Sequence, residues 1–206
     1  TPLDDGGVAI ELDGGAVTLP APALRGAHQQ ANAALATAAL IAAMPDTPAD
    51  ALARGVTRTV WPGRLDRLAD GSLTSLLDQP VWIDGAHNAH GAAALAAALP
   101  SIDKGNWHFI CGALNTRPAS EFLSRIAPLA ESIHCVPIPD QPASLTAETL
   151  AAKAAALHTG ARAAPSVAGA LQAIASGSVG ADRPVMICGS LYLAGHVLAA
   201  NGTLPD

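Results

Sequence analysis

Apolar residues in the last two-thirds of the chain gather in short runs that are separated by alanine-rich stretches. The runs predict strands at Val81–Ile83, Trp107–Cys111, Ser132–Val136 and Pro184–Cys188. The alanine-rich stretches predict helices near Gly91–Leu99, Ser120–Ala130, Thr146–His158, Ser166–Ala175 and Leu191–Ala200. An initial edge strand, or a hairpin around Asp70-Gly71, is expected within Leu65–Leu77. This alternation predicts an α/β fold, a mostly parallel sheet buried under helices.

The first 59 residues have a different pattern. Val8–Leu12 and Ala16–Leu19 flank Asp13-Gly14-Gly15 and predict a hairpin. Helices are predicted at Ala33–Ala43 and at Pro48–Gly55, the second with proline in its first turn and glycine at its end. A hairpin with two helices is too small to fold alone. We therefore expect residues 1–59 to be the tail of a larger domain in a truncated chain.

Composition narrows the class of protein. Half of the 206 residues are hydrophobic but only 3% are aromatic, so Ala, Leu, Val and Ile must build the core. The longest apolar stretches are shorter than the roughly 20 residues of a membrane-spanning helix, and the pattern predicts a cytoplasmic protein without membrane contact. A net charge of −6 without basic clusters argues against nucleic acid as a partner. Cys111, Cys135 and Cys188 lie in apolar segments, which predicts buried, reduced thiols.

Two motifs contain residues that could bind a ligand or take part in catalysis. Trp61-Pro62-Gly63-Arg64 predicts a rigid turn that fixes the approach of one arginine, and Asp84-Gly85-Ala86-His87-Asn88 follows a predicted strand. Ligands in open α/β sheets bind at such strand ends. The Arg64 guanidinium suits phosphate oxygens and could stabilise charge that develops on a phosphorylated carboxylate. Without the Trp-Pro-Gly frame, a surface arginine beside Asp66 would be the simpler interpretation.

Asp84 could hold a ribose hydroxyl or position an amine, and His87 could hydrogen-bond a phosphate or carboxylate. The alternative is structural, with Asp84 starting a turn and His87 capping the next helix. His87 and His90 could share a helical turn, but nothing nearby completes a set of metal ligands, so no metal site is predicted.

Two further residues stand at predicted helix starts. Ser190 opens the last helix, where a hydroxyl and backbone N–H groups could bind a carboxylate, or Ser190 could be a plain N-cap. Asn32 could cap its helix or contact the adenine edge with its donor and acceptor. The chain contains neither Gly-x-Ser-x-Gly nor Gly-x-Gly-x-x-Gly after a strand, which argues against a serine hydrolase elbow and a dinucleotide dehydrogenase.

The four segments described above, which contain Asn32, Arg64, Asp84 with His87, and Ser190, follow one another in an order that resembles the folylpolyglutamate synthase/dihydrofolate synthase branch of the Mur-type amide ligases. The resemblance implies that residues 1–59 end an ATP-binding domain, residues 60–63 form a linker, and residues 64–206 form a Rossmann-like C-terminal domain. The implied reaction uses ATP and Mg²⁺ to add L-glutamate to dihydropteroate or a reduced folate through an acyl phosphate. The family also suggests a monomer. A peptidoglycan-type Mur ligase and a non-catalytic nucleotide-binding domain remain alternatives.

The resemblance also assigns roles to residues. It implies that Asn32, Arg64 and Asp84 bind the nucleotide, that Arg64 and His87 are catalytic, and that His87 and Ser190 hold glutamate. No Gly-x-x-x-x-Gly-Lys-Ser/Thr occurs, so the phosphate loop and magnesium ligands are expected outside this chain, which should be inactive alone. The loop from Asn115 to Pro118 departs from the Lys-Asp of the family: Arg117 can keep the positive charge, but a proline replaces the acid.

Overall fold

The computed structural model describes residues 1–12, 15–177, 180 and 182–204. The chain divides into two compact units, Thr1–Trp61 and Pro62–Asp206. This division falls inside the segment 60–63 that the sequence predicts as a linker. The assignment of residues 1–59 to the tail of an ATP-binding domain stays a prediction.

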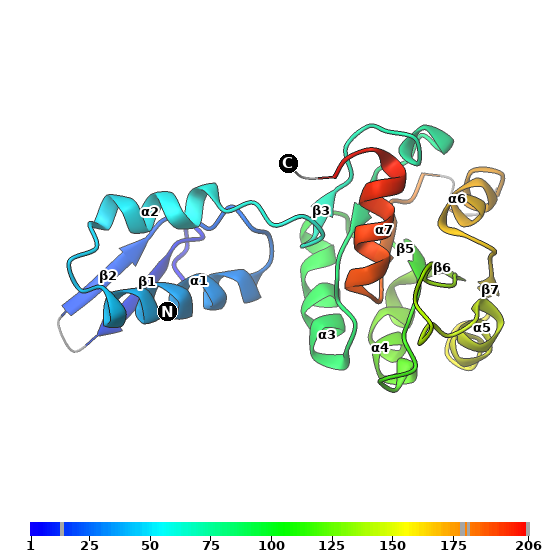
Figure 1. The fold of residues 1–206 in the computed structure, drawn as a ribbon, viewed down its shortest axis with the longest axis horizontal. Coiled ribbons are helices and arrows are strands. Elements are labelled where there is room, and N and C mark those ends of the chain that lie inside the picture. Colours follow the sequence, from blue (N-terminus) through cyan, green and yellow to red (C-terminus); the bar gives the residue numbers. More distant parts are fainter. Residues whose placement is uncertain (13–14, 178–179, 181, 205–206) are drawn as a thin grey trace. The chain divides into compact units, whose positions relative to one another are not determined.

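Unit 1 is a hairpin with two helices (Figure 1). Its elements are β1 (Val8–Leu12), β2 (Gly15–Leu19), α1 (Ala27–Ala43) and α2 (Ala49–Arg58). The strands pair antiparallel, with Val8 opposite Leu19, which confirms the predicted hairpin. Asp13 and Gly14 of the predicted turn lie outside the described residues. Val8, Leu19 and Leu52 form the centre of a small apolar core.

Both helices of unit 1 differ from their predicted bounds. Helix α1 begins six residues earlier than predicted, at Ala27, because Gly26 adopts a φ of 100° that turns the chain into the helix. Helix α2 begins after Pro48 and runs past Gly55 to Arg58. The helix continues through this glycine because Leu52 and Val56, one turn apart, both pack in the core of unit 1.

Unit 2 is built around a six-stranded sheet (Figure 1). Its strands are β3 (Asp66–Arg67), β4 (Val81–Ile83), β5 (Trp107–Cys111), β6 (Ala130–Cys135), β7 (Ala161–Ala163) and β8 (Val185–Cys188). Its helices are η1 (Thr74–Leu76), α3 (Ala89–Ala98), η2 (Leu99–Ser101), α4 (Ala119–Ile126), η3 (Ala127–Leu129), α5 (Ala147–Ala155), α6 (Val167–Ala175) and α7 (Leu191–Asn201). The strand order is β3-β4-β8-β5-β6-β7, and every pair except β3–β4 is parallel. The predicted α/β fold with a mostly parallel sheet is confirmed.

Helices cover both faces of this sheet, as predicted. Helices α3, α4 and α5 pack on the face that carries Trp82 and Phe109. Helices α6 and α7 pack on the opposite face, which carries Ile83 and Ile187. Since successive strand residues are buried on opposite faces, the strands need no polar alternation. None of the helices in the described part of the chain is long and apolar enough to cross a membrane.

Several elements of unit 2 differ from the prediction in their bounds, and one strand was missed. Strand β7 was not predicted, because three residues at the sheet edge carry too little apolar signal. Helix α4 ends at Ile126 rather than Ala130, because Pro128 continues it only as a 3₁₀ turn. Within Leu65–Leu77 the predicted edge strand is present as β3. The alternative prediction, a hairpin around Asp70-Gly71, is not what forms: the chain continues into the 3₁₀ turn η1.

The three cysteines occupy neighbouring positions in one row across the sheet. Cys111 pairs in register with Cys135 on one side and with Cys188 on the other. All three are buried and free, as predicted, and the Sγ atoms of Cys111 and Cys188 lie 3.8 Å apart. The contact with Cys188 and burial raise the pKa of Cys111, and burial raises that of Cys135. Thiols in this state are poor nucleophiles, so the row is part of the core.

A buried polar chain lies on the face covered by α6 and α7. His108 Nε2 is 2.9 Å from the Gly180 carbonyl oxygen and therefore donates to it, so in the neutral ring Nδ1 accepts from the Ser132 hydroxyl at 2.7 Å. The Ser132 oxygen in turn accepts from His134 Nε2 at 3.1 Å. His134 Nδ1 is buried and has no hydrogen-bond partner among the residues that the structure describes. Burial, with smaller contributions from Arg162 and His108, lowers the pKa of His134 from 6.5 to about 4.

This histidine makes stability depend on pH. Below pH 6.5 the unfolded chain binds a proton at His134, whereas the folded chain binds it only near pH 4, so protonation favours unfolding. We expect the free energy of unfolding to fall by about 2 kcal/mol between pH 7 and pH 5 through this residue. Urea denaturation at a series of pH values should show the slope, and His134→Gln should flatten it. The exposed His90 provides the control, since a slope also flattened by His90→Gln would contradict this origin.

Candidate functional site

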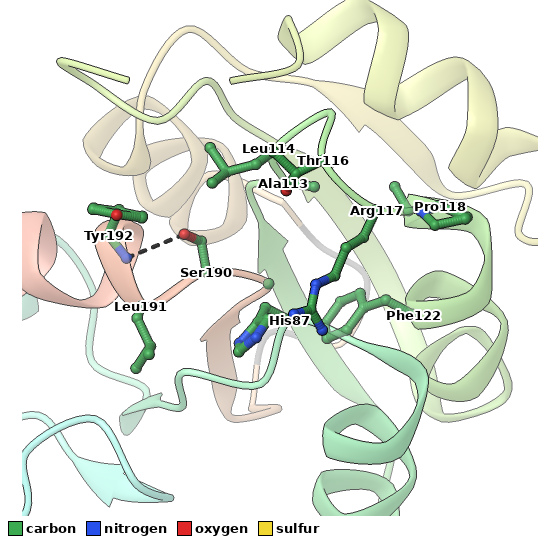
Figure 2. A pocket seen from close by; sticks show the side chains of 12 residues that line it. His87, Ala113, Leu114, Thr116, Arg117, Pro118, Phe122, Ser190, Leu191 and Tyr192 are labelled. Carbon is green, nitrogen blue, oxygen red and sulfur yellow. Dashed lines mark hydrogen bonds between the residues drawn. The ribbon is translucent and has the colours of Figure 1, made fainter. Parts of the chain in front are cut away.

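Loops from three adjacent strands meet around one pocket of unit 2 (Figure 2). They follow the carboxyl ends of β4, β8 and β5, where ligands of parallel sheets bind. The pocket has a volume of about 220 Å³. It is lined by His87, Ala113, Leu114, Thr116, Arg117, Pro118, Ala119, Phe122, Gly189, Ser190, Leu191 and Tyr192. The structure thus brings together His87 and Ser190, the two residues predicted to hold glutamate.

His87 lines the pocket, and its Nε2 forms no hydrogen bond with the described residues. Its Nδ1 is 2.9 Å from the Gly85 carbonyl oxygen and must donate to it. In the neutral ring Nε2 is then a hydrogen-bond acceptor. The alternative that His87 caps helix α3 is wrong, because Asn88 caps it by accepting from the N–H of Gly91 at 2.7 Å.

Ser190 lies at the start of α7 and is only 3% exposed. Its Oγ accepts the N–H of Tyr192 at 3.1 Å, so the residue is the N-cap of the helix while also lining the pocket. Its hydroxyl proton remains available to a ligand. The sharp turn before it depends on Gly189, whose φ is 103° and whose N–H donates to the Ala86 carbonyl at 2.8 Å.

Asp84 is buried, and its carboxylate binds the backbone. One oxygen accepts the N–H of Ala86 at 2.7 Å, which forms the predicted turn. The other accepts the N–H of Leu65 at 2.8 Å, across the 19 residues that separate the two motifs. The structure therefore joins the Trp-Pro-Gly-Arg turn to the Asp-Gly-Ala-His-Asn loop.

Arg64 follows Gly63, which has a φ of 75°, and its side chain is half-buried. Within the described part of the chain it forms no ion pair. A guanidinium with no carboxylate partner keeps its charge available to an anionic ligand.

Asn32 belongs to unit 1, where it lies exposed on α1 and donates to Gln29 Oε1 at 3.0 Å. It lies inside the helix rather than at its start, so the capping alternative is wrong. It borders a largely apolar pocket of about 440 Å³ between α1 and α2. That Asn32 shares a site with Arg64 stays a prediction.

Arg117 and Tyr192 are pocket residues to which the sequence analysis gave no role. Arg117 could have been found from its place in the loop after β5, and Tyr192 from its place two residues after Ser190. Figure 2 shows the Arg117 side chain reaching toward the side of the pocket where His87 lies. No three His, Cys, Asp or Glu side chains of the described residues gather in a group that could hold a metal ion.

The family model described as Mur ligase, glutamate ligase domain, matches residues 63–191. The chain belongs to the Mur ligase family. The match covers the core of unit 2, including Arg64, Asp84, His87 and Ser190.

Individual relatives of this Mur ligase chain act in folate metabolism. It is 33% identical to the folylpolyglutamate synthase of Lacticaseibacillus casei, over 91% of this chain and 41% of the relative. A structure of Mycobacterium tuberculosis folylpolyglutamate synthase, complexed with ADP and AMPPCP, superposes with a TM-score of 0.77 at 25% identity. That match covers 98% of this chain and 49% of the other. The chain thus spans less than half the length of each.

Another solved structure is a bifunctional folylpolyglutamate synthase/dihydrofolate synthase with Mn, AMPPNP and L-glutamate bound. Its TM-score is 0.70 at 25% identity, over 88% of this chain and 41% of the other.

Gly189 is the glycine on which the pocket most directly depends. A Cβ here would lie 2.4 Å from the backbone oxygen of Gly112, and φ is positive. We expect Gly189→Ala to destabilise the Mur ligase chain by about 2 kcal/mol or more, measured by urea denaturation. Gly195 in the same segment is the control, because a Cβ there meets nothing within 4 Å inside helix α7. Gly195→Ala should stabilise by about 0.5–1 kcal/mol, and equal effects of the two changes would contradict the strained turn.

Proposed function

We propose that this chain is the glutamate-binding part of an ATP-dependent ligase that adds L-glutamate to dihydropteroate, to folates, or to both. The observation that carries the proposal is the pocket at the carboxyl ends of β4, β8 and β5, lined by Arg117, His87 and Ser190. The family match to a glutamate ligase domain supports it, as do the folylpolyglutamate synthase relatives.

The chemistry of the pocket suits glutamate. A dicarboxylate needs two anion-binding positions, and the Arg117 guanidinium and the Ser190 hydroxyl provide them on different loops. Leu114 and Phe122 offer apolar surface to the methylene groups of the ligand. The Nε2 of His87 can accept a hydrogen bond from the amine and take its proton as the amine attacks.

The nucleotide is proposed to bind beside Arg64. Its guanidinium would contact phosphate oxygens and stabilise the charge that develops as phosphate moves to the pterin carboxylate. Asn32 would contact adenine, which the apolar pocket beside it supports. Mg²⁺ would neutralise the phosphates, with its protein ligands expected outside this chain. The acyl phosphate formed on the pterin substrate then reacts with the amine of glutamate and releases phosphate.

The direct test is ADP release by the complete ligase that contains this chain. We expect release from ATP and Mg²⁺ only when L-glutamate and a pterin substrate are both present. Dihydropteroate and tetrahydrofolate are supplied in separate reactions, so the one that is used identifies the acceptor. If neither pterin supports ADP release, although the protein is folded and binds ATP, the result would point to another Mur ligase substrate or to a non-catalytic domain.

Arg117 tests the glutamate pocket itself. In the complete ligase, Arg117→Ala should raise the KM for glutamate by about tenfold or more and leave the KM for ATP unchanged, because a charged hydrogen bond to the amino acid is lost. Steady-state kinetics with glutamate varied measures the change. Arg125 is the matched control, since it is an exposed arginine on the helix that follows. An equal rise in KM for Arg125→Ala would mean that charge alone, rather than the pocket, is responsible.

A further inference from the structure

The side-chain amide of Asn32 is held by a residue that lies one turn earlier on helix α1. Its Nδ2 donates to Gln29 Oε1 at 3.0 Å. Residues three positions apart lie on the same face of a helix, and both side chains border the largely apolar pocket of unit 1. The bond uses one of the two amide hydrogens of Asn32, and among the described residues no hydrogen bond engages its Oδ1. The oxygen and the second hydrogen are therefore available to a ligand.

Gln29 is a polar side chain in a position where an apolar one would pack without the cost of burying an amide. It is 6% exposed. Its Nε2 lies 3.1 Å from His28 Nε2, and because an amide NH₂ group can only donate, the histidine nitrogen accepts. Turning the glutamine amide by 180° would set its oxygen against the lone pair of His28 and its NH₂ group against that of Asn32. The two contacts thus hold the Gln29 amide in one orientation, and Gln29 in turn holds that of Asn32.

An asparagine amide in a fixed orientation can distinguish adenine from guanine. Adenine presents the N6 amino group, a donor, beside the acceptor N7, whereas guanine presents the acceptor O6 in place of the amino group. Asn32 can accept from N6 through Oδ1 and donate to N7 with its second Nδ2 hydrogen. With guanine, Oδ1 would face O6, and two acceptors repel each other. An amide that could turn freely would suit either base.

We propose that Gln29 is a positioning residue that fixes the amide orientation of Asn32 and so makes the nucleotide site prefer adenine to guanine. The inference rests on the proposed function in one respect, that Asn32 contacts the base. Ala33, Ala36 and Leu40, which line the same pocket, offer apolar surface that suits any purine ring. The choice between the two bases therefore falls to the amide.

The ratio of the GDP and ADP dissociation constants tests this role. Both are measured by titration calorimetry on the complete ligase. Gln29→Met keeps the length of the side chain but removes the amide, so the Asn32 amide can turn and donate to O6. We expect the ratio to fall by about tenfold, most of it through tighter GDP binding. Gln29→Glu keeps an oxygen acceptor for Asn32 Nδ2 and should hold the ratio within about twofold of the natural value. An unchanged ratio in Gln29→Met, or an equal fall in Gln29→Glu, would overturn the proposal.

Asn32→Ala separates the positioning role from a direct contact. In this background Gln29→Met should change the ratio by less than about twofold, because the group that Gln29 positions is already absent. A tenfold change there would show that Gln29 contacts the base itself and would overturn the proposal. If Asn32→Ala alone leaves both ADP affinity and the ratio unchanged, the adenine contact in the proposed function fails. If Asn32→Ala weakens ADP binding but Gln29→Met leaves the ratio unchanged, only the role of Gln29 fails.

Gln30 provides the matched control, because it is a glutamine on the same helix whose amide is engaged elsewhere. Its Nε2 donates to the Gly6 carbonyl at 2.8 Å, and its side chain does not border the pocket that Asn32 borders. Gln30→Met should leave the ratio of the two dissociation constants unchanged. A tenfold fall in this variant would overturn the assignment of the effect to Gln29.

Discussion

The contact on which the arrangement of the site depends is the buried Asp84 carboxylate between two backbone N–H groups. A carboxylate taken out of water must be compensated by hydrogen bonds, and here one donor, the N–H of Leu65, lies 19 residues away in the sequence while the other is the nearby N–H of Ala86. The cost of burial is therefore offset only when the Arg64 turn and the β4 loop are both in place. Displacing either segment would leave the buried carboxylate without one of these donors, so the two segments are held together.

The same loop connects Arg64 to the pocket. Beyond Asp84, the Ala86 carbonyl accepts the N–H of Gly189, and the next residue is Ser190, which caps α7. A short path of backbone hydrogen bonds thus runs from the proposed phosphate-binding arginine to the proposed glutamate pocket. It is short because β4 and β8 are neighbours in the sheet, so that their carboxyl ends meet. In the proposed ligation the phosphate and the amine meet at one carboxyl group, and this connection would hold the groups that bind them at a fixed separation.

Much of the fold follows from the apolar pattern, because buried strands such as Trp107–Cys111 need continuous apolar runs. The pattern fails where tertiary contacts decide. Strand β7 exists because the edge of β6 offers backbone groups for pairing, and its Ala-Arg-Ala sequence carries no signal of that. Helix α2 passes through Gly55 because packing on either side of the glycine outweighs its low helix propensity. Local propensity was the wrong guide in both places.

Of the candidate residues, the sequence pointed to His87 and Ser190, which line the pocket, but not to the hydrogen bonds that connect the loops. Polar groups after apolar strands identified Asp84, His87 and Ser190, since parallel strands place their carboxyl ends together. No pattern in the sequence reveals that the Asp84 carboxylate reaches back to Leu65, because a hydrogen bond between distant segments leaves no periodic signal.

The role of Arg117 was also not predictable from the sequence, because its loop lacks the acid that the family resemblance led us to expect. The loop is instead braced by its backbone: the N–H of Asn115 donates to Ala143 at 2.8 Å, and the N–H of Leu145 donates to Ala113 at 2.9 Å. These bonds fix the backbone of the loop, and Arg117 forms no ion pair with the described residues, so its charge is available to a ligand. A carboxylate beside Arg117 would compete with the proposed glutamate ligand for the guanidinium, and proline at position 118 introduces no such competitor.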